Sequence, residues 1–190
     1  PVTNLVHMLS MMLIPSALIF ALGRMIGNRR QAWVLFIAVF FLFLVMWSVV
    51  YGSERYGVPE LVRAGLVGGN MEGKEVRFGL FGSALFTTVT TGATTGSVNG
   101  MHDSLTPLGG FVPLFQMMLN NVFGGDGAGL LNILLYVILG VFLTGLMVGR
   151  TPELFGKKIE TKEMKLAAIA LLAHPFTILV PTAIALALTA

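Results

Sequence analysis

Long apolar runs dominate the chain, and polar residues gather in the short stretches between them. The clearest run, Ala32 to Tyr51, holds twenty residues without a charged side chain. A helix rises about 1.5 Å per residue, so this run is long enough to cross a hydrocarbon core of about 30 Å. The earlier apolar stretch from Leu5 to Leu22, interrupted by Ser10, Pro15 and Ser16, predicts a second spanning helix or the end of one.

The next apolar segment, Phe78 to Val89, is shorter and is followed by backbone rich in threonine and glycine. Its twelve residues would make about 18 Å of helix, which is too short to span a bilayer. The chain returns to polar sequence at 101–104. This order predicts a half-length helix and a re-entrant loop, which is stable at membrane depth only where protein or a water-filled cavity surrounds it.

Two further apolar segments, Pro107 to Phe123 and Gly129 to Gly149, are separated by the sequence GGDGAG at 124–129. One helix over both segments would be about 64 Å long, so an interruption is expected. Two separate crossings would put the basic loop 150–165 on the outer side, whereas one broken crossing puts it inside, in agreement with the positive-inside rule. We therefore predict one crossing that is broken at 124–129.

Charges and prolines complete the predicted topology. The turn 23–31 holds three arginines and no acidic residue, so it is predicted to be cytoplasmic. The stretch 52–78 carries four residues of each sign, which suits the outer side. The final apolar run, Leu166 to about Leu188, contains Pro175 and Pro181 and predicts a kinked spanning helix.

The composition agrees with an all-α polytopic membrane protein. Of the residues, 55% are apolar and 11% are charged, and the mean hydropathy is +0.85. This balance excludes an ordinary soluble enzyme. The net charge of +3 does not indicate nucleic-acid binding, because the basic residues lie in short clusters between apolar runs. The chain has no cysteine, opens on Pro1 and stops at Ala190 inside an apolar run, so we expect a piece of a longer protein.

The Thr/Gly loop at 91–98 is the candidate site. A dehydrated cation crosses a membrane only if oxygen atoms replace its hydration shell, which backbone carbonyls can do when successive C=O groups face one axis. Glycine permits the required conformations, so we place Gly96 at the ion-binding level. The other candidate filter residues are Thr94, Thr95, Ser97 and Val98. Alternatively, the four-residue spacing of Gly92, Gly96 and Gly100 is typical of a helix contact face.

The sequence offers other candidate functional residues with weaker support. The segment GGDGAG resembles a dinucleotide fingerprint, but no strand precedes it, so a gate loop formed by Gly124, Gly125, Asp126 and Gly127 is favoured. Asp126 is either a functional acid within the membrane or an exposed loop charge. The three histidines have no metal-ligand spacing and are interpreted as structural residues.

Four strings, in this order, resemble the potassium-translocating A subunit (KdpA) family of the bacterial Kdp P-type ATPase, which is similar in architecture to the Trk/Ktr/HKT superfamily. They are MEGKEVRFG at 71–79, TTGATTGSVNGMHDS at 90–104, FGGDGAGL at 123–130 and GLMVGRTPELFGKKIETKEMKL at 145–166. The resemblance covers nearly the whole chain. It implies four helix–pore loop–helix repeats around one pore, of which this chain holds the third.

The resemblance divides the chain into four parts. Residues 1–31 form a preceding transmembrane helix and cytoplasmic turn, 32–149 the repeat with its broken second helix, 150–165 a cytoplasmic loop, and 166–190 the first helix of the next repeat. The intramembrane loop of the repeat is 124–129. The family's Ser-Cys-Gly-Ala filter string is replaced by Thr94-Thr95-Gly96-Ser97, which keeps the glycine and removes the thiol.

The resemblance also implies a function. The transported ion is K⁺, coordinated by the backbone carbonyls of Thr95 and Gly96, and no covalent cofactor is expected. ATP hydrolysis belongs to a separate P-type subunit (KdpB), with the small accessory subunits KdpC and KdpF, in the bacterial plasma membrane. This chain is expected to hold no catalytic residues and to bind no nucleic acid. A Trk-type channel-like or gradient-driven cation transporter and a non-conducting membrane scaffold remain alternatives.

Overall fold

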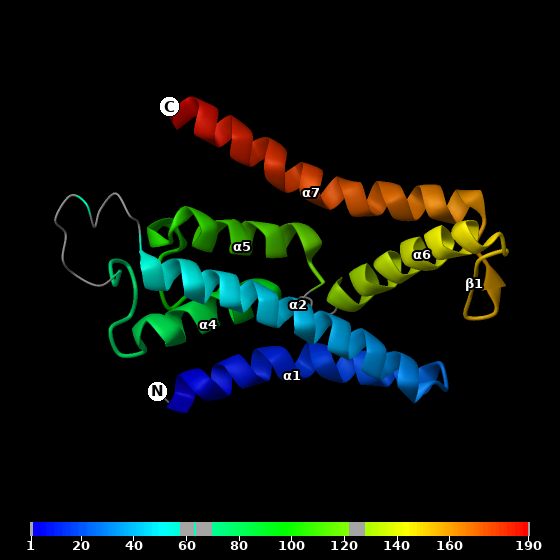
Figure 1. Cartoon of the computed structure of the whole chain (residues 1–190), viewed down its shortest axis with the longest axis horizontal. Helices are drawn as coiled ribbons and strands as arrows, with labels where there is room; N and C mark the ends of the chain where they lie inside the picture. The colour runs from blue at the N-terminus through cyan, green and yellow to red at the C-terminus, as the bar shows by residue number, and fades with distance from the viewer. Residues whose placement is uncertain (1, 58–62, 64–69, 122–127, 190) are drawn as a thin grey trace.

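The computed structural model describes residues 2–57, 63, 70–121 and 128–189. Two long helices, α1 (Val2–Met25) and α2 (Arg29–Tyr56), form an antiparallel pair along the molecule (Figure 1). Asn28 caps α2, since its side-chain oxygen accepts hydrogen bonds from the backbone N–H groups of Arg30 and Gln31. The twenty-residue apolar run predicted to be helical therefore lies wholly inside α2.

The half-length helix is α4 (Gly79–Gly92), and the backbone after it is not helical until the single turn η1 (His102–Ser104). The helix ends three residues later than the apolar run suggested. We expected the threonine run to lie outside the helix, but the threonines up to Thr91 are helical, so this expectation is wrong for them. The reason is local: the hydroxyls of Thr88 and Thr91 donate to the carbonyls of Ala84 and Thr87, which satisfies buried hydroxyls within the helix.

The second helix of the repeat is interrupted, but the predicted bounds of the break, 124–129, are wrong: the first half already ends at Leu119, and Ala128 and Gly129 belong to the second half. The first half, α5 (Pro107–Leu119), ends at Asn120 in a left-handed conformation with φ 45°, and the second half, α6 (Ala128–Val148), begins after a gap in the described residues. The two halves follow one another along the long axis (Figure 1). The predicted gate residues Gly124, Gly125, Asp126 and Gly127 lie outside the described residues.

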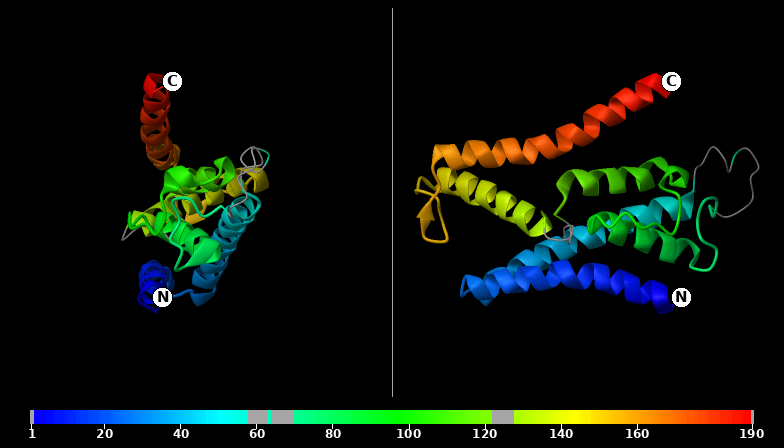
Figure 2. Two further views of the ribbon diagram at one scale, coloured as in Figure 1. Left: turned by 90° about the vertical axis from the view of Figure 1, so that its left-hand side faces the viewer. Right: turned by 180° about the vertical axis from the view of Figure 1, so that it is seen from behind.

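A short antiparallel hairpin, which the sequence pattern did not predict, follows α6. Its strands are β1 (Glu153–Leu154) and β2 (Lys157–Lys158), with Glu153 opposite Lys158. The hairpin lies at the same end of the molecule as the α1–α2 turn (Figure 1). The last helix, α7 (Thr161–Thr189), remains helical through Pro175 and Pro181 and changes direction along its length (Figure 2).

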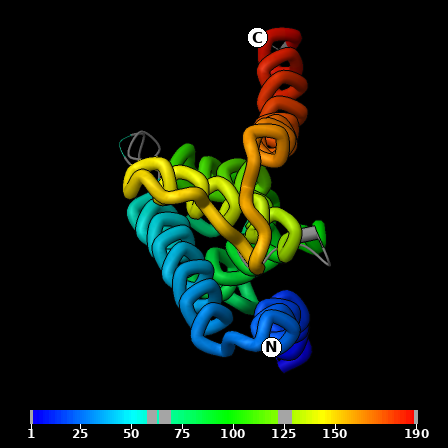
Figure 3. Tube along the Cα trace, turned by 90° about the vertical axis from the view of Figure 1, so that its right-hand side faces the viewer, coloured from blue at the N-terminus to red at the C-terminus, as the bar shows by residue number. Residues whose placement is uncertain are grey.

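Within the described residues, four helices are long and apolar enough to cross a membrane, namely α1, α2, α6 and α7. The core lies where α1, α2 and α4 meet, around Met11, Phe43, Phe86 and Val89. Figure 3, seen along the long axis, shows α7 projecting from the remaining helices. The predicted class, an all-α polytopic membrane protein with a broken second helix, is confirmed.

Candidate ion-binding site

The segment Thr94–Val98, called the pore loop below, begins one residue after the Ala93 cap of α4. Its backbone changes handedness from residue to residue: φ is 53° at Thr94 and 73° at Gly96, whereas φ at Thr95 is not positive. Alternation of positive and negative φ gives a curved backbone that differs from a strand, where successive peptide groups point to opposite sides. A carbonyl-lined ion site also requires backbone that is neither a regular helix nor a strand.

Hydrogen bonds fix the loop at its start and leave later carbonyls open. The N–H of Thr94 donates to the carbonyl of Thr91 at 3.2 Å, and that of Thr95 donates to the carbonyl of Thr90 at 3.1 Å. Within the described part of the chain, the carbonyls of Thr94, Thr95 and Gly96 accept no hydrogen bond. These oxygens are therefore available to a cation or to water.

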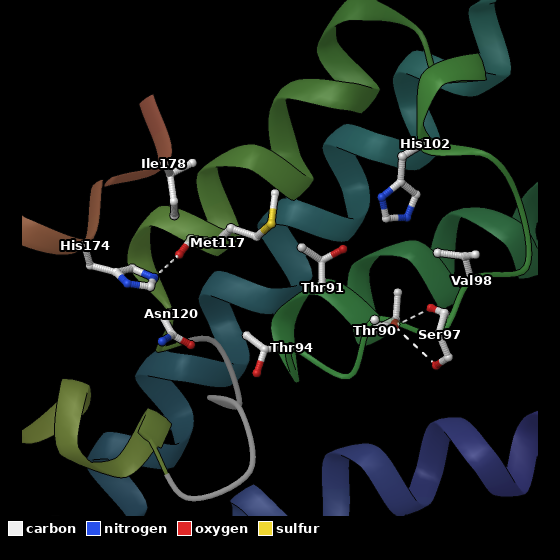
Figure 4. A pocket seen from close by; sticks show the side chains of 11 residues that line it. Thr90, Thr91, Thr94, Ser97, Val98, His102, Met117, Asn120, His174 and Ile178 are labelled. Atoms are coloured by element: carbon white, nitrogen blue, oxygen red, sulfur yellow. Dashed lines mark hydrogen bonds between the residues drawn. The ribbon is translucent and has the colours of Figure 1, made fainter. Parts of the chain in front are cut away.

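A cavity of about 480 Å³ lies beside the pore loop (Figure 4). Four of the five predicted filter residues line it, and α5 and α7 supply the facing wall. The described lining residues are Thr90, Thr91, Thr94, Gly96, Ser97, Val98, His102, Met117, Asn120, His174 and Ile178. None of them is an aspartate, glutamate, lysine or arginine. The described lining therefore combines threonine and serine hydroxyls with a larger apolar surface and brings no aspartate, glutamate, lysine or arginine charge to the cavity.

Two of the histidines from the sequence analysis line this cavity. His174 of α7 has Nε2 2.9 Å from the carbonyl of Met117, which links α7 to the last turn of α5 (Figure 4). His102 in η1 is half-buried, and burial lowers the pKa of its imidazole, so the neutral ring is favoured. His174 therefore fits the structural role that the sequence suggested. His102 does not, because its buried Nε2 has no hydrogen-bond partner among the described residues.

Thr95 differs from the other predicted filter residues because its side chain turns away from the cavity. Its Oγ1 lies 2.8 Å from Oγ1 of Thr90 and 3.0 Å from Sδ of Met11 on α1. The alternative interpretation of Gly92, Gly96 and Gly100 as one helix face is wrong, since only Gly92 is helical.

Sequence reasoning missed a buried ion pair at the end of α2. It belongs to a cluster, here called the outer clamp, formed by Glu54, Asn70, Lys74 and Thr106. The Glu54 carboxylate at the end of α2 is 2.9 Å from Nζ of Lys74, and both side chains are almost fully buried. It also accepts hydrogen bonds from the Thr106 N–H at 2.7 Å, the Thr106 hydroxyl at 2.8 Å and the Asn70 amide at 2.6 Å. Both charges are thus fully partnered.

The outer clamp is connected to the backbone that follows the pore loop, two residues after Val98. Lys74 and Gly100 form an isolated antiparallel bridge, in which the N–H of Met101 donates to the carbonyl of Gly73 at 2.8 Å. The sequence analysis saw these acidic and basic residues only as a balanced set of outer charges. The one available signal was an acid at the end of a long apolar run, which does not reveal its partner.

Four membrane-length helices, together with the shorter helices α4 and α5, define an all-α polytopic membrane protein. Comparison with known protein families identifies the family to which the chain belongs. The family described as "Potassium-transporting ATPase A subunit" matches residues 1–190. The chain therefore belongs to this family, as the sequence resemblance implied.

Three relatives are each named "Potassium-transporting ATPase potassium-binding subunit". The chain is 62% identical over 98% of its length to that of Geobacillus kaustophilus (strain HTA426), 56% over 97% to that of Delftia acidovorans (strain DSM 14801 / SPH-1), and 58% over 96% to that of Caldanaerobacter subterraneus subsp. tengcongensis. It spans about one third of the length of these relatives, 34%, 34% and 33% respectively.

Proposed function

We propose that this chain is the pore-forming part of a potassium-binding and potassium-translocating subunit, in which the carbonyls of Thr95 and Gly96 coordinate K⁺. The observation that carries the proposal is the alternating handedness at Thr94 and Gly96, in a loop whose carbonyls are open. The names of the three relatives support K⁺ as the ion.

The helix before the loop assists electrostatically. The C-terminal end of α4, at Gly92, leads directly into the pore loop. The carbonyl end of a helix carries a partial negative charge of about half an electron, which favours a cation placed near it. Together with carbonyls in place of side-chain charges, this arrangement stabilises a dehydrated monovalent cation without trapping it.

The energy source is assigned to another chain. The relatives are named as the potassium-binding subunit of an ATPase, which supports the assignment of ATP hydrolysis to a separate P-type subunit, KdpB, with KdpC and KdpF as accessory subunits. The complex would lie in the bacterial plasma membrane. The present chain would contribute one quarter of the filter ring and no catalytic group.

Replacement of Gly96 by aspartate in the full-length subunit tests the proposal. Aspartate tolerates left-handed backbone better than most residues, so its main effect is to place a carboxylate among the carbonyls. We expect loss of K⁺ uptake or of K⁺ selectivity in cells, with assembly of the complex retained in detergent.

Gly156→Asp is the matched control, because Gly156 also has positive φ, 77°, but lies in the hairpin at the other end of the molecule. This variant should transport K⁺ normally. If Gly96→Asp disrupts assembly and leaves ion selectivity intact in the complex that remains, the scaffold interpretation replaces the filter.

A further inference from the structure

We propose that the hydroxyl of Thr90 is a positioning group that sets the ion selectivity of the pore loop. This inference rests on the proposed function. Thr90 lies in the last turn of α4 and is only 1% exposed. Its Oγ1 donates a hydrogen bond to the carbonyl of Ser97 (Figure 4). The same atom lies 2.8 Å from Oγ1 of Thr95, so one side chain contacts two positions of the loop.

The threonines beside it show what is unusual about Thr90. The hydroxyls of Thr88 and Thr91 donate to carbonyls four residues earlier in their own helix, at 2.9 and 2.8 Å. This is the ordinary way to satisfy a buried threonine in a helix. The hydroxyl of Thr90 instead bonds to the loop seven residues ahead. It is therefore a tertiary contact and not part of the helix.

The number of hydroxyl protons fixes the direction of the hydrogen bond between Thr90 and Ser97. A hydroxyl has one proton, and the carbonyl of Ser97 can only accept, so the Thr90 proton belongs to that bond. The single proton of the Thr95 hydroxyl then goes either to Oγ1 of Thr90 or to the sulfur of Met11, because both lie within reach and neither has a proton to give to Thr95. Met11 of α1, 6% exposed, has its sulfur 3.0 Å from Thr95 Oγ1 and closes the other side of this pair.

The arrangement sorts the oxygen atoms of the loop into two sets. The carbonyl of Ser97 and the hydroxyl of Thr95 face the helix, where they are hydrogen-bonded. The carbonyls of Thr95 and Gly96 have no such partner within the described residues. A ring of carbonyls discriminates between cations only while its spacing is maintained, so these hydrogen bonds keep K⁺ favoured over ions of other size.

Thr90→Val in the complete transport complex tests this role, since valine keeps the shape and removes the hydroxyl. We expect the K⁺ concentration for half-maximal uptake to rise about fivefold, the factor for one hydrogen bond of about 1 kcal/mol. Discrimination against Rb⁺ and Na⁺ should fall, with little change in maximal rate. Thr90→Ser, which retains the hydroxyl, should keep both properties.

Thr88→Val is the matched control, because this threonine is fully buried in the same helix and bonds only to its own helix. It should leave K⁺ affinity and discrimination unchanged. If Thr90→Val lowers thermal stability like Thr88→Val but leaves affinity and discrimination intact, Thr90 has only a structural role and the inference is wrong.

A second variant keeps the test decisive if Thr90→Val does not assemble. Thr95→Ala removes the partner hydroxyl at an exposed position and should weaken K⁺ discrimination in the same direction by a smaller factor. Unchanged discrimination in Thr95→Ala would then overturn the inference. The proposed function is judged separately, because it fails only if Gly96→Asp transports K⁺ with normal selectivity.

Discussion

Gly109 shows how closely individual residues fit around the outer clamp. A methyl group at this position would lie 2.3 Å from the Glu54 carboxylate and 3.0 Å from the hydroxyl of Thr106. Gly109→Ala should therefore destabilise the protein by about 1–3 kcal/mol through overpacking. Thermal denaturation of the full-length subunit in detergent measures this loss, with the fraction of protein that remains monodisperse as the observable.

The adjacent Gly110 provides the control for Gly109→Ala. No atom outside its immediate neighbours lies within 4 Å of a methyl group placed there. Alanine is favoured over glycine in a helix by about 1 kcal/mol, so Gly110→Ala should be neutral or stabilising. Equal stability of the two variants would show that the contact with Glu54 does not constrain α5.

Sequence reasoning located Gly96 but not Thr94 as a residue of unusual backbone conformation. Glycine is the residue expected at positive φ, so a glycine in a Thr/Gly run is a direct signal. Threonine is β-branched and seldom adopts the left-handed region, so the φ of 53° at Thr94 could not be anticipated. Thr90 was missed for a related reason, because nothing in a threonine run tells which hydroxyl bonds outside its own helix.

At the scale of elements, the outer clamp joins the end of α2 to the start of α5 and to the segment before α4. Removal of one charge leaves the other buried and unpaired, so Glu54→Gln or Lys74→Met alone should cost about 3–5 kcal/mol. The double variant should lose clearly less free energy of unfolding than the sum of the losses in the two single variants. The thermal denaturation of the four proteins in detergent, analysed as a double-mutant cycle, measures this coupling.

Additivity of the two single losses would contradict the pairing of Glu54 with Lys74. An unrelated exposed pair supplies the control: Arg77 and Glu75 are linked at 2.9 Å on the surface. Exposed ion pairs contribute little to stability, so the same cycle at 75 and 77 should give a coupling near zero. The contrast would show that burial, and not charge pairing as such, makes the outer clamp important.

Element types were more predictable than element ends. Length and hydropathy were sufficient for α1, α2 and α7, and the length of the segment 107–149 indicated an interruption between α5 and α6, which begins earlier than the glycine run suggested. The C-terminal end of α4 was predicted too early. Threonine has a low helix propensity, but the hydroxyls of Thr88 and Thr91 form hydrogen bonds within the helix, which propensity alone does not take into account. The hairpin at 153–158 has strands of only two residues, too short to show an alternating pattern.

At the scale of the whole molecule, the two basic segments lie at one end and the outer clamp at the other (Figure 1). This arrangement follows if α5 and α6 together make a single crossing. Had they formed two, the hairpin would lie beside η1. The positive-inside rule then assigns the end with the arginine turn and the lysine hairpin to the cytoplasm.

Thiol labelling of intact cells tests this orientation, and the absence of cysteine from this chain makes single-cysteine variants simple to interpret. Glu72, Gln31 and Lys157 are exposed at the ends of the molecule. In a full-length subunit without other accessible cysteines, a membrane-impermeant maleimide should label Glu72→Cys in intact cells. It should label Gln31→Cys and Lys157→Cys only after the membrane is permeabilised.

The informative comparison is between positions 31 and 157. Equal protection of both places an even number of crossings between them, which requires α5 and α6 to be one broken crossing, since α2 already supplies the other. Labelling of Lys157→Cys from outside, with Gln31→Cys protected, would mean that α5 and α6 cross separately. That result would contradict the broken second helix and the assignment of residues 107–149 to a single crossing of the pore repeat.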